Sequence, residues 1–186
     1  MKFKLTFIFT LAISTAFSQG SFSHAVGIAG YLGTREASSQ SIGGTYSPRY
    51  NFLSFAESST LSVGTHLGLA FSLNNRDVSN FTYHVPIVLE YNFGHASSTS
   101  NSEKKSGGFI GVGYSFESTH VTRYLGYGLG SITTEETIQG PMANVGMRFK
   151  IAKESFGIRA SYLYGTGDLE GGYMISFGFQ YNFGMN

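Results

Sequence analysis

The last apolar segment of the chain, residues 172–184, alternates between two kinds of side chain. Its second face is small or polar apart from Met174, whereas its first face is wholly aliphatic and aromatic: Tyr173, Ile175, Phe177, Phe179, Tyr181 and Phe183. Side chains point to opposite sides at successive positions of a β-strand. The pattern therefore predicts a strand with one apolar and one polar surface.

Seven earlier segments have the same character, and together with 172–184 they make eight predicted strands: 24–34, 41–55, 60–73, 81–93, 108–117, 140–151 and 156–164. The alternation is clearest in 60–73, where leucine, valine and phenylalanine oppose serine, glycine and His66. Segment 24–34 leaves its outward face open, because both faces hold small residues. In 41–55, Pro48 lacks an amide donor, so we expect a lost ladder bond with a bulge or local twist.

The apolar faces of these strands need a cover, and no other part of the chain could form a second layer. A closed barrel with lipid outside and a polar, small-residue interior meets this need. The predicted fold is all-β, an eight-stranded antiparallel up-and-down transmembrane β-barrel. An even strand number lets the first and last strands pair, which removes free sheet edges.

The lengths of the connections predict an orientation. Such barrels keep their termini and short turns in the periplasm and their longer loops outside. We therefore expect outer loops near 35–41, 73–81, 117–139 and 165–171, and inner turns near 55–59, 94–107 and 152–155. The polar segment 94–107 is long for an inner turn. Segment 117–139 is the longest connection and is able to extend its two strands beyond the membrane.

The first residues have the features of a secretory signal. Lys2 and Lys4 precede a short apolar run, 5–13, which small residues follow. The run is too short to span a bilayer as a helix. We expect residues 1–18 to be a signal peptide and residues 19–186 to form the barrel domain.

Composition narrows the functional classes. The absence of cysteine excludes disulfides, thiolate metal sites and cysteine catalysis. The 12 basic and 11 acidic residues nearly balance, so no basic field exists for nucleic acid. Charged residues make up only 12% of the chain, which is less than a soluble surface needs.

Charged and polar residues fall on the predicted inward rows, and they form a candidate polar network in the lumen: His66, Glu90, Arg148, Lys150, Arg159, Gln180 and Asn182. An eight-stranded barrel is only wide enough to be filled by its own side chains. Buried charges should be paired, so Glu90 with Arg148 or Arg159 is the expected interior pair. A structural network that plugs the lumen is favoured over an ion path.

Two strands end in nearly the same five residues, Glu90–Gly94 (EYNFG) and Gln180–Gly184 (QYNFG). Both belong to even-numbered strands and should reach the same membrane surface. Aromatic residues gather at such surfaces. We expect Tyr91, Phe93, Tyr181 and Phe183 to be interface aromatics.

The signal, the alternating strands, the segment VPIVLEYNFG (85–94) and the aromatic last strand resemble small outer-membrane β-barrels of the OmpA and OmpX type and PorT-like barrel domains. The resemblance covers the whole mature chain as a pattern. It implies location in the outer membrane, contact with outer-membrane lipid, and recognition of the last strand by the barrel assembly machinery. Three residues follow Phe183 here, whereas the usual pattern ends on the aromatic residue.

The sequence gives little support for a catalytic site or a metal site. The five histidines show no metalloprotease spacing, and no cofactor or metal is expected. Some barrels of this size resemble lipid A deacylases or acyltransferases, and Glu117, Ser118 and His120 lie together at a strand end. Only Ser118 and His120 would share a face of that strand.

Three functions remain. The favoured one is a non-enzymatic, monomeric outer-membrane barrel with a structural or surface-interaction role, whose contact with an extracellular partner involves 117–139. The alternatives are a small barrel enzyme acting on lipid and a soluble lipocalin-like carrier with inverted faces. A wide pore would need about 16 strands.

Overall fold

The computed structural model describes residues 20–34, 38–56, 58–72, 81–97, 104–124, 131–166 and 171–183. The predicted signal peptide, 1–18, lies outside these residues. The assigned strands are β1 (Ser21–Thr34), β2 (Ser38–Ala56), β3 (Ser59–Gly64), β4 (Leu67–Ser72), β5 (Phe81–Gly94), β6 (Ser106–Tyr124), β7 (Ser131–Ile151), β8 (Glu154–Tyr164) and β9 (Tyr173–Phe183). No helix among the described residues is long and apolar enough to cross a membrane.

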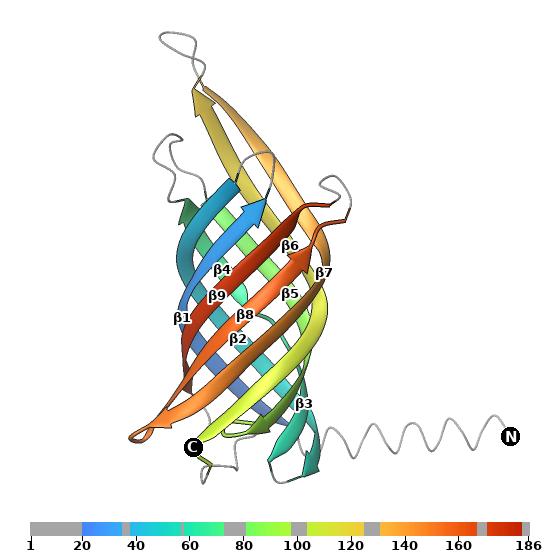
Figure 1. The fold of residues 1–186 in the computed structure, drawn as a ribbon, viewed down its shortest axis with the longest axis vertical. Coiled ribbons are helices and arrows are strands. Elements are labelled where there is room, and N and C mark those ends of the chain that lie inside the picture. Colours follow the sequence, from blue (N-terminus) through green and yellow to red (C-terminus); the bar gives the residue numbers. More distant parts are fainter. Residues whose placement is uncertain are drawn as a thin grey trace, which may run out of the picture.

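The strands form one closed antiparallel ring (Figure 1). Strands that follow one another in sequence pair, and β1 pairs with β9 to close the sheet. β3 and β4 both pair with β2 and β5, so they are two halves of one strand and the ring has eight members. The predicted fold class is confirmed. We call the end where β1 starts and β9 finishes the terminal end, and the other the hairpin end.

Two prolines explain the interruption between β3 and β4. Both halves keep one register against β2 and one against β5, which places Pro48 opposite Thr65 and Pro86 opposite His66. The Thr65 amide donates to the Pro48 carbonyl at 3.1 Å. Neither proline can donate in return, so the ladder loses one bond on each side at adjacent residues.

The bulge expected at Pro48 lies elsewhere in β2. The register against β3 shifts between Asn51 and Leu53 and again between Ser54 and Ala56. The missing donor of Pro48 thus breaks a ladder bond without displacing the strands. The irregular pairing is confined to the terminal end of β2.

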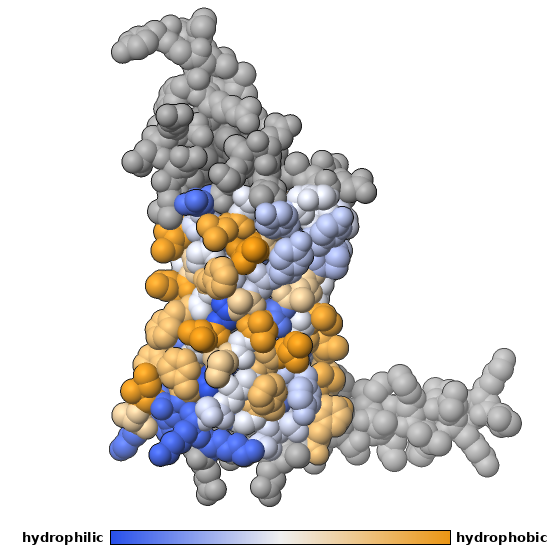
Figure 2. Space-filling model, in the orientation of Figure 1, coloured by the Kyte–Doolittle hydropathy of each residue, from blue (hydrophilic) through white to orange (hydrophobic). Residues whose placement is uncertain are grey.

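The outward rows are apolar around the ring. Ile87 and Val112, for example, are each 62% exposed, whereas the residues before and after Ile87, Pro86 and Val88, are buried. The outward face of β1, open from the sequence, carries Val26, Ile28 and Leu32. Figure 2 shows hydrophobic residues across much of the visible wall, with hydrophilic residues gathered at one end.

The two halves of the lumen differ in their share of apolar side chains, although His84, Ser115 and Glu117 are buried toward the hairpin end as well. Toward the hairpin end the lumen holds a buried apolar cluster: Ala29, Tyr31, Ala70, Val88, Ile138, Met142, Leu163 and Met174. Toward the terminal end it is polar. The polar, small-residue interior expected from the sequence is found toward the terminal end, whereas toward the hairpin end larger aliphatic residues also face inward and pack together.

β6 and β7 extend beyond the other strands at the hairpin end (Figure 1). Their ladder continues to the pair Tyr124–Ser131, whereas the pairing of β5 with β6 stops at Thr82–Thr119. Much of the predicted loop 117–139 is thus a two-stranded ribbon.

Candidate functional site in the barrel lumen

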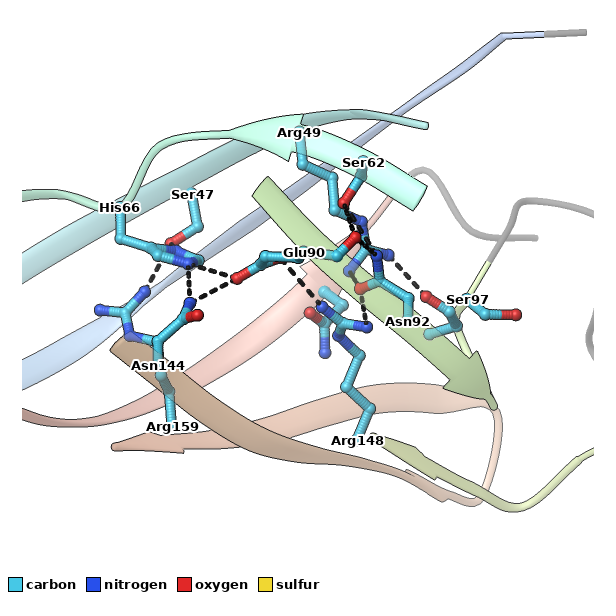
Figure 3. A network of polar contacts seen from close by, with 12 residues as sticks. Ser47, Arg49, Ser62, His66, Glu90, Asn92, Ser97, Asn144, Arg148 and Arg159 are labelled. Atoms are coloured by element: carbon cyan, nitrogen blue, oxygen red, sulfur yellow. Dashed lines mark hydrogen bonds and ion pairs between the residues drawn. The ribbon is translucent and has the colours of Figure 1, made fainter. Parts of the chain in front are cut away.

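Glu90 of β5 lies at the centre of the polar half of the lumen and is only 1% exposed (Figure 3). Its Oε1 atom lies 2.9 Å from His66 Nε2 and accepts a hydrogen bond from Asn144 Nδ2 at 2.5 Å. Its Oε2 atom lies 3.9 Å from a terminal nitrogen of Arg148. One carboxylate thus joins β5, β7 and the interrupted strand.

Asn92 lies one inward position further along β5 and binds two arginines (Figure 3). Arg49 and Arg148 donate to its Oδ1 atom at 3.0 and 2.8 Å. The Asn92 amide nitrogen donates to Ser62 Oγ at 2.8 Å. Arg148 also lies 4.2 Å from the ring centre of Phe109, a cation–π distance.

The remaining predicted lumen residues lie around this centre. Arg159 is buried and donates to Ser47 Oγ at 3.3 Å, and no ion pair joins it to Glu90. Gln180 is buried and donates to Asn182 Oδ1 at 3.4 Å. Lys150 lies on the inward row of β7 near the terminal end, where it is half-buried. Of the two expected partners for Glu90, the structure places Arg148 beside it.

The turn that follows β5 covers the lumen at the terminal end. Arg49 donates to the carbonyl of Ala96 at 2.5 Å, and Thr60 donates to the carbonyl of Ser97 at 2.5 Å. His95 Nε2 lies 3.0 Å from Ser155 Oγ. His95, Ala96 and Ser97 are each at most 3% exposed. Residues 94–97, at the start of this long inner connection, therefore pack onto the barrel, and we call them the cap.

Sequence reasoning missed Arg49 and Asn92, although a signal for both exists. Tyr46 and Tyr50 of β2 point outward, and alternation then directs Arg49 inward. Asn92 belongs to the same inward row as Glu90. The bonds to the cap carbonyls had no such signal, because loop conformation does not follow the strand period.

A second buried polar group lies toward the hairpin end. His84 Nδ1 lies 3.3 Å from Ser115 Oγ and 3.7 Å from Glu117 Oε2. A catalytic triad needs the serine and the acid at opposite ring nitrogens, whereas here both approach the same one. The arrangement cannot pass a proton from the serine to the acid through the ring.

The other catalytic candidates are no better placed. Ser118 is only 1% exposed, so its hydroxyl does not face lipid. The side chain of His120 lies outside the described residues. Among the described residues, no group of three or more histidine, aspartate and glutamate side chains could hold a metal ion.

The four predicted interface aromatics are exposed on the outer wall. Tyr91 and Phe93 of β5 are 41% and 47% exposed, and Tyr181 and Phe183 of β9 are each 37% exposed. β5 and β9 are four strands apart in the ring, so the two copies of the motif lie on opposite sides of the barrel. Phe183 also stacks on His24 of β1, with ring centres 5.3 Å apart, at the seam that closes the sheet.

Known proteins resemble this chain in structure only. No protein-family model matches the sequence, and no curated protein matches it. The attachment invasion locus protein Ail of Yersinia pestis is 14% identical, with a TM-score of 0.56, over 88% of this chain and 99% of Ail. Neisserial surface protein A (NspA) is 12% identical, with a TM-score of 0.56, over 88% of this chain and 97% of NspA. The chain therefore has the fold of the small outer-membrane β-barrels.

Proposed function

We propose that this chain is a non-enzymatic outer-membrane β-barrel protein with a structural or surface-interaction role and a lumen filled by side chains. The observation that carries the proposal is the difference between the two faces of the barrel wall: the outer face is apolar, and the inner face holds charged side chains. Side chains such as Ile87 and Val112 would contact lipid, while Glu90 and the arginines are withdrawn into the lumen. A soluble carrier would need the opposite arrangement.

The proposed location is the outer membrane of a Gram-negative cell, reached through the signal peptide 1–18 and the barrel assembly machinery. The terminal end would face the periplasm and the hairpin end the outside, because the longer loops of such barrels are external. The closed ring has no free edge within its wall, which is consistent with a monomer.

The proposed contact for an extracellular partner is the ribbon of β6 and β7 within 117–139. Between His120 and Tyr124, described β6 residues pair only with β7, so the ribbon stands clear of the barrel wall. Ail has been solved with the heparin analogue sucrose octasulfate. Segment 117–139 holds three glutamates and one arginine, so a polyanion of this kind is a poor electrostatic match for it.

The test begins with the full chain expressed in a Gram-negative host. A folded barrel in the outer-membrane fraction should migrate differently in boiled and unboiled samples on a mild SDS gel. Intact cells that display the native chain are then tested for adhesion to immobilised host proteins, meaning proteins of the colonised organism and not of the expression strain. Cells that display a variant in which a two-residue Asn-Gly turn replaces 120–135 are tested in the same way. A matched variant that shortens 165–171 serves as the control.

Loss of adhesion in the first variant alone would support the ribbon as the contact, provided that both variants keep the gel shift. Equal adhesion of all three proteins would refute it. The enzymatic alternative is tested on the same cells, whose lipid A is extracted and analysed by mass spectrometry. A deacylase or acyltransferase would change the mass of the lipid A.

A further inference from the structure

The polar half of the lumen contains more buried positive than negative groups. Arg148 and Arg159 are 2% and 4% exposed, and among the residues that the structure describes Glu90 is the only carboxylate that acts electrostatically on either of them. Glu90 already uses one oxygen for His66 and Asn144. Its other oxygen is 3.9 Å from Arg148, beyond hydrogen-bond distance. Buried charge without a full counter-charge is costly.

A small cavity lies beside this excess charge. Its volume is about 10 Å³, and its lining includes Ser23, Arg148, Glu90, Gln180 and Asn182. A cavity of this size has room for one small ligand, such as a water molecule or a monatomic ion. Polyatomic anions such as sulfate or phosphate are too large for it.

Polar atoms in the cavity lining lack a hydrogen-bond partner, among them Arg148 Nε and Ser23 Oγ, and both of these residues are at most 2% exposed. The Arg148 Nε–H group can only donate, and the Ser23 hydroxyl can donate. Donors without a partner, next to an excess of positive charge, favour the binding of a ligand that accepts hydrogen bonds and carries negative charge.

We propose that this cavity binds one small monovalent inorganic anion, of which chloride is the physiological representative. Arg148 Nε and the Ser23 hydroxyl donate to it, and Gln180 and Asn182 lie at its border. The carboxylate of Glu90 borders the same cavity and sets the upper limit on anion affinity through repulsion. The anion joins β1, β7 and β9, and so links the closing seam to a strand that β8 separates from it.

The decisive experiment combines crystallography with stability measurements on the full refolded barrel. Crystals are grown in bromide, and anomalous scattering locates the halide. Unfolding midpoints are measured in chloride and in gluconate at equal ionic strength, because gluconate is too large for the cavity. An anomalous peak in the cavity and a midpoint that rises with the logarithm of chloride concentration are the expected results.

Two variants test the assignment of donors. Arg148→Gln should weaken the apparent chloride affinity by about 10- to 100-fold, the loss that one charged hydrogen bond implies. Ser23→Ala removes only one hydroxyl group, so this variant still tests the proposal if the Arg148→Gln variant does not fold. Ser176→Ala, which alters a serine pair elsewhere in the lumen, should keep the full chloride response. A cavity without a bromide peak, with identical midpoints in chloride and gluconate, would show that water alone occupies it and would overturn the proposal.

Discussion

His66 and Glu90 contact each other across the point where the barrel ladder is interrupted, with 2.9 Å between Nε2 and Oε1. His66 lies opposite Pro86, which cannot return a backbone hydrogen bond. The other ring nitrogen of His66 lies 2.9 Å from Ser47 Oγ of β2. The imidazole therefore links the interrupted strand to β2 and β5 at the point where backbone hydrogen bonds to these strands are missing.

Removal of the Glu90 carboxylate should destabilise the barrel strongly. Glu90→Ala leaves Arg148 buried without its carboxylate partner, and breaking a buried pair in this way costs on the order of 3–5 kcal/mol. Glu90→Gln, which keeps the shape and an acceptor for Asn144, should cost less. The free energy of unfolding is measured in urea from the folded fraction on unboiled gels, because the chain has no tryptophan.

The matched control makes the same chemical change, glutamate to glutamine, at an exposed strand end. Glu154 is the exposed first residue of β8 and accepts a hydrogen bond from the Tyr181 hydroxyl, which the amide oxygen of glutamine can also accept. Glu154→Gln should therefore change the unfolding free energy by about 0.5 kcal/mol or less. Similar losses in Glu90→Gln and Glu154→Gln would contradict a central role for the Glu90 carboxylate.

The depth of an outward position should decide the cost of a charge placed there. Ile87 lies midway along β5, and Ile87→Arg should cost about 2–4 kcal/mol in a bilayer. Phe93 lies at the end of the same strand, where arginine should cost about 0–1 kcal/mol. Urea unfolding in lipid vesicles measures both values. If both substitutions were neutral, the wall would not face lipid.

The strands and the closed barrel could be predicted from the sequence because the side-chain period of a strand repeats in every wall segment. The same period directs Glu90 and Arg148 into the lumen. The short bonds of Asn144 and Asn92 could not be predicted, because the stagger between strands decides which inward residues meet. Nor could the apolar cluster in the hairpin half of the lumen, since Leu163 and Met174 gain an apolar environment only where inward residues of β1, β4, β5 and β7 meet those of β8 and β9.

The sharp turn into the cap should require glycine at position 94. Gly94 has a φ of 73°, and an added Cβ would lie 2.6 Å from the Ser106 carbonyl oxygen. Gly94→Ala therefore combines left-handed strain with a backbone clash, and we expect a loss above about 2 kcal/mol.

Gly171 separates the two causes. Its φ is 82°, but no atom lies within 4 Å of an added Cβ, so Gly171→Ala should show the strain alone, about 1–2 kcal/mol. Urea unfolding gives both values. Equal losses would mean that the turn into the cap yields to the methyl group, and that its close packing contributes little.

The cap should make stability fall in mild acid. Burial lowers the pKa of His95, and the nearby charge of Lys150 lowers it further. The neutral ring is therefore favoured in the folded state, while the unfolded state titrates near its ordinary pKa of about 6.5. The contribution of His95 is fully present above about pH 6.5 and is lost as the pH falls through the folded pKa. The slope reaches at most about 1.4 kcal/mol per pH unit.

His95→Gln keeps a side chain able to reach Ser155 and cannot be protonated in this range. Unfolding free energies of both proteins are compared between about pH 8 and pH 5. Buried His66 and His84 are present in both proteins, so their contributions cancel in the difference. Below about pH 6.5 the native chain should lose more stability than the variant. Only the native chain has an imidazole at position 95 that becomes charged, and the folded cap must then either bury that charge or expose the ring. Parallel curves would show that the cap accommodates the imidazolium without cost.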